Sequence, residues 1–480
     1  MHPTQTGMFD NTNFAWISDM STDLKTIGHM LRDQGYYTAY KGKWHESEIA
    51  GDETQDAMEP YGFSDYQANG DFYGEPYDGF TKDHLTAAET TEWFKSKGKE
   101  VGAKGQPWYL AVNFINPHDI MYFDTDGEKS THTRGMFPIF SEPDDDIYKP
   151  KWETELPVSF DNPRTQHPPA VQFYKEYIDG SFGHIPDERK DLWHNHINYQ
   201  INCMRDVDRH IGTVLDTLEE TGFAENTIIF FSSDHGEMAT AHGLRQKGSI
   251  VFKEVINVPF IIVHPDGPKG VQTGAVGSHV DLVPTMLAFA GLSEAERKDK
   301  YPQLIGHDLS GVVADPTSHG PRGSTENPGI GCLITYEMLA TFDAQWLMEN
   351  AEYVLDTSEH RASARDMNAE EIKALVERID LPKMTVRNLY RCIFDGLYKL
   401  VRYFGLEDYT PPESVEDLLK RNDVGLYDLQ NDPDEMNNLA NPNNPDYDEE
   451  LLGRMNAKLN ALIMAEIAED KALIGASELE

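Results

Sequence analysis

Residues 230–263 constrain the fold more strongly than any other stretch of this sequence. Two apolar segments, residues 227–231 and 258–263, have the length and composition of buried strands. Between them the chain becomes polar and rich in glycine, beginning with Asp234 and His235 directly after the first segment. Open α/β sheets present their active-site residues in this way, at the carboxyl ends of strands. The stretch therefore predicts a functional loop on an α/β sheet.

The polar loop contains residue types that suit a metal ion and an anion. Asp234 and His235 are followed by Glu237, and Lys247 comes ten residues later. A carboxylate and an imidazole beside a lysine suit a metal ion that holds an anionic group. A charged surface loop without a ligand would fit most Asp-His-Gly tripeptides. We favour the functional interpretation because other predicted strands end in a similar way.

Two further predicted strands deliver polar side chains at their carboxyl ends. Residues 36–40 run into Lys43 and His45, with Gly42 permitting a sharp bend, and residues 107–114 run into His118. Each segment alone is more typical of a surface loop or a structural histidine. Together they predict a cationic pocket beside the candidate metal-binding residues Asp234 and His235, on the side of the sheet where ligands bind. Such a pocket suits cleavage of a small tetrahedral anionic ester, because cations hold the oxygens and an imidazole protonates the leaving alkoxide.

Helical patterns alternate with these strands. The clearest covers residues 187–221, and others cover 83–97 and 279–290, while a helix starting at Ser21 is expected to stop at Gly35. The alternation predicts an α/β fold with a mostly parallel central sheet and helices on both faces. Residues 119–189 read as a long irregular region that shapes the substrate site.

The pattern changes after about residue 320. Residues 389–394 and 397–404 predict a hairpin with an Asp395-Gly396 turn, and residues 425–429 predict another strand. A terminal helix is expected over residues 447–469. We therefore predict a catalytic domain over residues 1–320 and a smaller C-terminal α+β domain over residues 321–480.

Charge and cysteine content limit the partners. The net charge is −41, from 82 acidic and 41 basic residues, so the surface repels nucleic acid and anionic membranes. No apolar run approaches the roughly 18–20 residues of a membrane-spanning helix. The three cysteines, Cys203, Cys332 and Cys392, are widely spaced and are expected to be buried free thiols. An anionic substrate would need a local concentration of cations.

At this point the chain resembles the sulfatase family of the alkaline phosphatase superfamily. The resemblance runs nearly from end to end, and the ordered G-K-W-H and S-D-H-G-E motifs are specific. The segments that carry it include PTQTGM (3–8), GKWH (42–45), PWYLAVNFINPH (107–118), SSDHGE (232–237) and HGLRQKG (242–248).

The resemblance implies a role for each motif residue. Asp234 and His235 would bind a divalent cation, usually calcium, with Mg²⁺ and Mn²⁺ as alternatives. Lys43 and His45 would contact the sulfate and the nucleophile. His118 and Lys247 would contact the sulfate and the leaving-group oxygen. The implied substrate is a sulfate ester, on a glycan or on a small alcohol.

His235 keeps a second enzyme class open. Many sulfatases have Asn at the equivalent position, and His occurs in some exo-acting glycan sulfatases and in phosphonate monoester hydrolases. The alternative activity is therefore hydrolysis of phosphonate monoesters or phosphodiesters. A non-catalytic protein that binds sulfated ligands is a third possibility. Nothing in the sequence assigns a compartment or an oligomeric state.

The sequence also departs from the family. In sulfatases PTQTGM closely follows C-x-P-x-R or S-x-P-x-R, whose Cys or Ser becomes the formylglycine nucleophile. A strand ending in two metal-ligating Asp residues comes earlier still. The present sequence starts at Met1, past that motif, so we expect it to be a fragment, half of a split protein or a degenerate relative. We also expect this exact chain to be unstable or to aggregate, because a missing central strand exposes sheet edges, and to hydrolyse little substrate.

Overall fold

The computed structural model describes most of the chain. Described are residues 2–9, 19–47, 57–67, 74–127, 137–338, 385–407 and 409–468, and the single positions 49, 343, 346 and 383. Part of the predicted irregular region 119–189, and the last residue of the predicted terminal helix, lie outside this set. None of the helices in the described ranges is long and apolar enough to cross a membrane.

The first part of the chain contains two pairs of strands. Strand β1 (Tyr37–Gly42) runs parallel to β2 (Trp108–Asn113), while β3 (Ile229–Ser232) runs antiparallel to β4 (Phe260–Val263). Among the described residues no ladder joins the two pairs. The parallel order expected from the sequence thus holds for β1–β2 but is wrong for β3–β4. A parallel return needs a crossover of a dozen or more residues, usually a helix, whereas the loop after β3 contains only α7 (Lys253–Ile256) and a short 3₁₀ turn.

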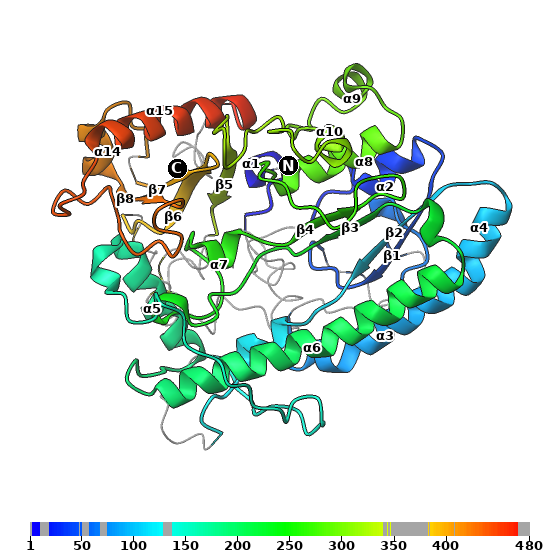
Figure 1. The fold of residues 1–480 in the computed structure, drawn as a ribbon, viewed down its shortest axis with the longest axis horizontal. Helices are drawn as coiled ribbons and strands as arrows, with labels where there is room; N and C mark the ends of the chain where they lie inside the picture. The colour runs from blue at the N-terminus through cyan, green and yellow to red at the C-terminus, as the bar shows by residue number, and fades with distance from the viewer. Residues whose placement is uncertain are drawn as a thin grey trace, which may run out of the picture.

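Helices cover both faces of these strands, as the α/β pattern predicts. Helices α3 (Asp78–Trp93) and α6 (Lys190–Glu220) lie side by side on one face, and α2 (Ile27–Arg32) and α8 (Leu282–Phe289) lie on the other (Figure 1). Two separate apolar clusters fill the layers. The first, around Ala39, joins the strands to α3 and α6, and the second joins β2 to α2 and α8.

Several predicted helix boundaries differ from the observed ones. Helix α2 begins at Ile27 rather than near Ser21, because the Thr26 hydroxyl accepts hydrogen bonds from the N–H groups of the first turn. The helix predicted over residues 83–97 begins five residues earlier, and a π-helical turn (Phe94–Gly98) and α4 (Lys99–Ala103) follow it. Helix α5 (Pro169–Phe182) was missed, although its proline at the first helical position is a typical start.

The C-terminal part is a four-stranded antiparallel sheet with the order β5 (Cys332–Tyr336), β6 (Leu389–Phe394), β7 (Tyr398–Phe404) and β8 (Asp423–Asp428). The predicted β6–β7 hairpin is confirmed, but its turn is shifted by one residue. The Asp395 N–H donates to the Tyr398 carbonyl (3.1 Å), so Gly396 and Leu397 are the central residues. Gly396 has a φ of 110°, which explains the glycine at the first of these positions.

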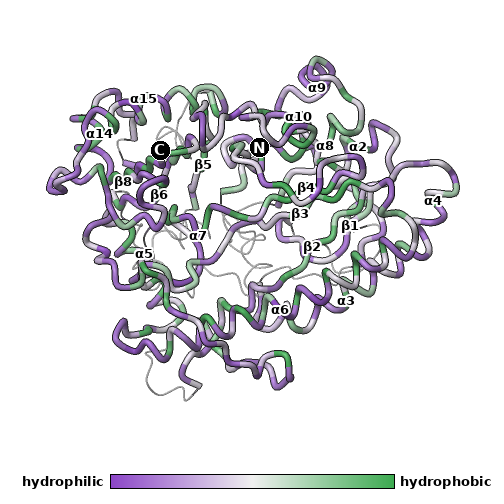
Figure 2. Tube along the Cα trace, in the orientation of Figure 1, coloured by the Kyte–Doolittle hydropathy of each residue, from purple (hydrophilic) through white to green (hydrophobic). Residues whose placement is uncertain are grey.

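Two helices pack on this sheet, α14 (Val415–Arg421) and α15 (Glu449–Glu466). Leu400, Leu426 and Leu459 belong to the core between α15 and the sheet. Apolar residues follow the strands, whereas α3, α6 and α15 present many polar residues (Figure 2). The remaining short helices are α1 (Pro3–Thr6), α9 (Glu294–Lys300) and α10 (Ser310–Ala314).

Candidate active site

The end of β1 is held against the end of β2. Gly42 has a φ of 85°, and a Cβ atom there would lie 2.0 Å from the Asn113 carbonyl oxygen, so only glycine fits. The Lys43 N–H then donates to the same carbonyl at 2.8 Å. The expected bend at Gly42 is confirmed, and it places Lys43 beside the segment that leads to His118.

Buried carboxylates fix the segment that carries His118. Asp83, on α3, accepts hydrogen bonds from the N–H groups of Ile115 (2.7 Å) and Asn116 (3.0 Å), just before a cis Asn116–Pro117 bond. Asp119 accepts from the first turn of α3, at the Gly79 and Phe80 N–H groups. From the sequence Asp83 was placed only as the first residue of a helix, and no local pattern indicated its buried role.

The loop from Asp234 to Lys247 is also braced from within. Gly236 is required because a Cβ atom would lie 1.9 Å from the Glu254 carbonyl oxygen. The Glu237 carboxylate accepts from the Gln246 N–H and lies 3.5 Å from Nε2 of the buried His196 on α6. Glu237 therefore supports the loop from inside instead of facing a ligand. The loop also contains non-glycine residues with positive φ, a form of strain that is concentrated at functional sites: Ala239, Thr240, His242 and Gln246.

The three strand ends meet around His118. Burial and the nearby charges of Lys247 and Lys43 hold the pKa of His118 well below its usual value. His235 and His45 act on this ring in the same direction. Residues that are separated by up to about two hundred positions in sequence therefore interact electrostatically at one place. The structure brings all six predicted site residues together, and their chemical roles stay predictions.

Asp234 and His235 present two potential metal-binding atoms close to each other. Asp234 Oδ2 and His235 Nε2 lie 3.3 Å apart, while His235 Nδ1 lies 2.9 Å from the Gly236 carbonyl. Nδ1 therefore carries the proton in the neutral ring, and Nε2 keeps its lone pair. Burial and the Lys247 charge lower the pKa of His235, which favours this neutral form.

Asp234 is the charged member of the pair. Partial desolvation would raise the pKa of Asp234, but the positive charges of His235 when it is protonated and of Lys247 and Lys43 outweigh this and lower it. A carboxylate and a neutral imidazole are both ready to bind a cation without losing a proton.

Glu46 is an acidic neighbour that the sequence interpretation missed. Desolvation, and then the negative charge of Asp234, raise the pKa of Glu46, so the two carboxylates lie within range of electrostatic repulsion. A cation nearby would relieve that repulsion. Within the described parts of the chain, however, no group of three or more His, Cys, Asp or Glu side chains has the arrangement of a metal site. Calcium needs about 6–8 oxygen ligands, so the residues here fit only part of a metal-binding shell.

The cysteines are not among the residues that act on His118. All three are buried free thiols, as expected, and burial raises the pKa of Cys203, Cys332 and Cys392. A thiol with a raised pKa is a poor nucleophile. The described cysteines therefore do not supply a nucleophile to the cluster around His118.

Known proteins resemble this chain in sequence and in fold. The ulvan-active sulfatase of Formosa agariphila is 26% identical over 340 residues, which are 67% of this chain and 55% of that protein. The chain spans little more than half the length of the curated relatives it matches. Among solved structures, a 2-O GAG sulfatase superposes with a TM-score of 0.64 at 17% identity, over 98% of this chain and 80% of the other.

A phosphonate monoester hydrolase from Silicibacter pomeroyi shares the same fold. It superposes with a TM-score of 0.57 at 16% identity, over 98% of this chain and 85% of the other. At such identities these structures establish the alkaline phosphatase-like fold and do not distinguish between activities. The sulfatase family model, in contrast, matches residues 1–292, which is more than half of the sequence. This chain therefore belongs to the sulfatase family.

Proposed function

We propose that this chain carries the sulfate-binding and leaving-group side of a site that hydrolyses sulfate esters. The observation that supports the proposal most is the meeting of Lys43, His118 and Lys247 beside Asp234 and His235. Cations that converge on a small site in a chain with a net charge of −41 favour an anionic substrate. Residues 1–320 would form the catalytic domain, and residues 321–480 a separate C-terminal domain.

The two lysines would hold the sulfate oxygens, and His118 would serve the leaving group. Without an anion, the neighbouring cations and burial keep the His118 ring neutral. A bound sulfate opposes those positive charges and raises the proton affinity of the ring. His118 would then protonate the departing alkoxide oxygen.

Asp234 and His235 would contribute two ligands to a divalent cation, calcium in the first place and Mg²⁺ or Mn²⁺ otherwise. When bound, such an ion neutralises negative charge on a sulfate oxygen. Glu46 lies close enough to Asp234 to repel it, which supports a cation at this place. The remaining ligands would come from outside the described residues.

The nucleophile would also come from outside the described residues. The family resemblance indicates formylglycine, and His45 with Lys43 would face it. The described cysteines are buried, which supports this assignment. We accordingly expect the 480-residue chain alone to bind sulfate but to release little of it from an ester.

The substrate class favoured here is a sulfated glycan. The similar proteins include one named for ulvan and one named for GAG 2-O sulfate. His235 supports a second candidate, hydrolysis of phosphonate monoesters or phosphodiesters, because the family contains this variant in such enzymes.

Binding and turnover test the proposal separately. Calorimetric titration with inorganic sulfate should show binding that Lys247→Ala weakens at least tenfold, whereas Lys298→Ala, a matched change on the exposed helix α9, leaves it unchanged. Equal affinities in both variants would contradict the sulfate site. Rates on 4-nitrophenyl sulfate and on 4-nitrophenyl phenylphosphonate, measured side by side, distinguish the two activities. Robust sulfate release by the 480-residue chain alone would contradict our expectation that this chain releases little sulfate.

A further inference from the structure

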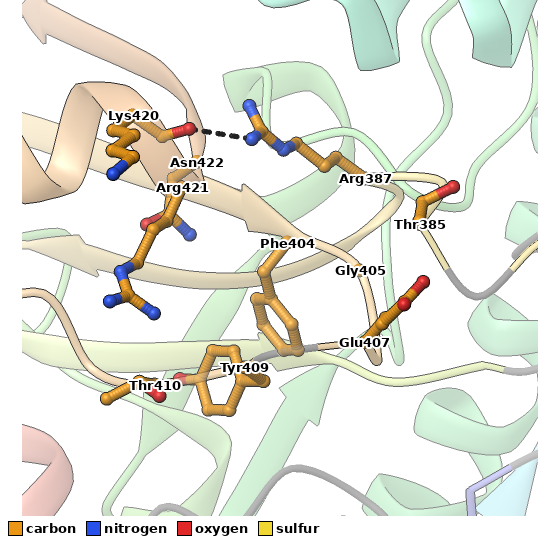
Figure 3. A pocket seen from close by; sticks show the side chains of 10 residues that line it. All are labelled: Thr385, Arg387, Phe404, Gly405, Glu407, Tyr409, Thr410, Lys420, Arg421 and Asn422. Carbon is orange, nitrogen blue, oxygen red and sulfur yellow. Dashed lines mark hydrogen bonds between the residues drawn. The ribbon is translucent and has the colours of Figure 1, made fainter.

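A cavity of about 430 Å³ opens in the C-terminal sheet, where β7 ends and β8 begins (Figure 3). Its volume lies within the usual range of ligand sites, roughly 300–1,000 Å³. None of its lining residues belongs to the cluster around His118. Its lining includes Arg387, Phe404, Tyr409, Lys420, Arg421 and Asn422.

The cavity has an aromatic floor. Phe404 is 2% exposed, and the Arg391 guanidinium lies 5.1 Å from the centre of its ring. The ring of Tyr409 lies against Phe404, with a centroid separation of 4.1 Å and an interplanar angle of 37°. Tyr409 is only partly buried, so it presents the accessible part of this aromatic pair to the cavity. An aromatic face of this kind suits the apolar face of a planar or ring-shaped ligand.

Positive charges line one side of the same cavity. Arg387 is fixed by hydrogen bonds to Asp423 (2.9 Å) and to the Lys420 carbonyl (2.8 Å). The Lys420 ammonium, in contrast, has no ion-pair partner among the described residues, and it is exposed beside Arg421. Arg421 pairs with Asp417 on its own helix. Lys420 is thus the lining cation without a carboxylate partner among the described residues, and in a chain with a net charge of −41 such a cation favours an anionic ligand group.

Glu407, the one acidic residue among the described residues that line the cavity, lies apart from Lys420 and Arg421. Figure 3 shows Glu407 on the opposite side of Phe404 from Lys420 and Arg421. The anionic part of a ligand would therefore meet Lys420 and Arg421 without facing Glu407.

A buried amide supplies an unmatched acceptor. Asn422 is 4% exposed, and its Nδ2 donates to the Tyr403 carbonyl at 3.1 Å. Its Oδ1 is buried and has no hydrogen-bond partner among the described residues. A ligand hydroxyl that donates to Oδ1 would supply the hydrogen bond that this acceptor lacks.

We propose that this cavity binds an acidic sugar unit of an oligosaccharide. The sugar ring lies on Tyr409, a ring hydroxyl donates to Asn422 Oδ1, and a sulfate or carboxylate group meets Lys420 and Arg421. A hydroxyl donor, a ring with an apolar face and a negative charge are combined in sulfated sugars and in uronic acids. The site is a binding site without chemistry of its own, and it stands whether or not the chain hydrolyses sulfate.

Titration with defined tetrasaccharides tests this proposal. A heparin-derived tetrasaccharide carries sulfates and carboxylates, a hyaluronan tetrasaccharide carries carboxylates alone, and maltotetraose is neutral. We expect the Lys247→Ala chain, with its candidate catalytic site weakened, to bind the acidic probes and not maltotetraose. Comparison of the two acidic probes shows whether sulfate or carboxylate is the preferred group.

Two substitutions in the Lys247→Ala background locate the binding. Lys420→Ala should weaken the binding of the acidic probes about fivefold, as loss of about 1 kcal/mol implies, and Tyr409→Ala about tenfold. Lys298→Ala removes the same charge elsewhere and should leave the affinity unchanged. Unaltered melting temperatures exclude unfolding as the cause. Acidic probes that bind equally to all variants, or that fail to bind at millimolar concentration, would overturn the proposal.

Discussion

The strands of the C-terminal sheet and the strands next to the candidate active site differ in burial more than in composition. From Lys399 to Phe404 every residue of β7 is buried. Strand β4 is more apolar and has no charged residue, yet its residues alternate between half-buried and exposed, with Ile261 52% and Val263 43% exposed. Phe231 on β3 is 39% exposed.

The difference lies in what covers the strands. Helix α15 packs across the C-terminal sheet, and the second face of that sheet meets the loop that follows the candidate site, including Val251. Charged side chains are buried there as pairs, Lys399 with Glu435 and Arg391 with Glu337. The C-terminal sheet is therefore a closed core, whereas β3 and β4 are open on part of their surface. A strand sequence alone does not determine how much of the strand is covered.

The largest effect is expected where the two regions are joined. Arg322 is fully buried and donates to Asp281, which precedes α8, and to Glu466 at the end of α15. Arg322→Met leaves both carboxylates buried without their cation, which should cost about 3–5 kcal/mol of unfolding free energy. Urea denaturation measures this loss, and Arg189→Met, at an exposed pair, is the control. A loss below about 1 kcal/mol would mean that the two regions do not depend on this contact.

A cavity in the closed core is expected to have the next largest effect. Leu400 is 0% exposed in the core under α15, so Leu400→Ala should destabilise the chain by about 2–5 kcal/mol. Val158→Ala, at a side chain that is 77% exposed, should change stability by less than about 0.5 kcal/mol. Thermal unfolding of the two variants side by side compares them directly. Similar losses would show that the contrast in burial does not govern stability.

The carboxylate behind His118 allows a test by pH. Burial, only partly offset by the N–H groups of Ile115 and Asn116, raises the pKa of Asp83 to about 8. Between pH 4 and 8 the folded chain keeps a proton that the unfolded chain has released, so this group makes stability fall as pH rises. Asp83→Asn removes that pH-dependent part.

The Asn variant should also lose a hydrogen-bond acceptor, which costs about 1–3 kcal/mol at pH 5. We therefore expect it to be less stable than the native chain at pH 5 and the difference to shrink towards pH 8. Urea denaturation at pH 5, 6.5 and 8 follows this trend. A difference that stays constant with pH would show that Asp83 is not protonated in the folded chain.

Much of the fold followed from local patterns. Glycine stops and apolar periodicity located α6, and strand-length apolar runs located β2 and the β6–β7 hairpin. The meeting of Lys43, His118 and Lys247 followed from their positions after strands, because carboxyl ends of strands share one side of a sheet.

The rest depends on contacts that a single sequence does not display. The direction of β4 follows from the absence of a crossover helix between β3 and β4. Helix α2 begins after Thr26, whose hydroxyl caps it, and not at the predicted start, Ser21. Asp83 and Glu46 were missed because their importance lies in long-range neighbours, backbone N–H groups for Asp83 and another carboxylate for Glu46.

The smallest effect is expected on the open strands. Ile261 is half exposed, so Ile261→Thr removes little buried apolar surface and keeps a β-branched residue that favours a strand. We expect a loss below about 1 kcal/mol, well under that of Leu400→Ala. The same substitution should lower aggregation on heating, because it interrupts an apolar surface shared with Phe231 and Val263. Light scattering during thermal unfolding measures the aggregation. A loss of stability as large as that of Leu400→Ala would contradict the exposure of Ile261 and would mean that β4 is covered in solution.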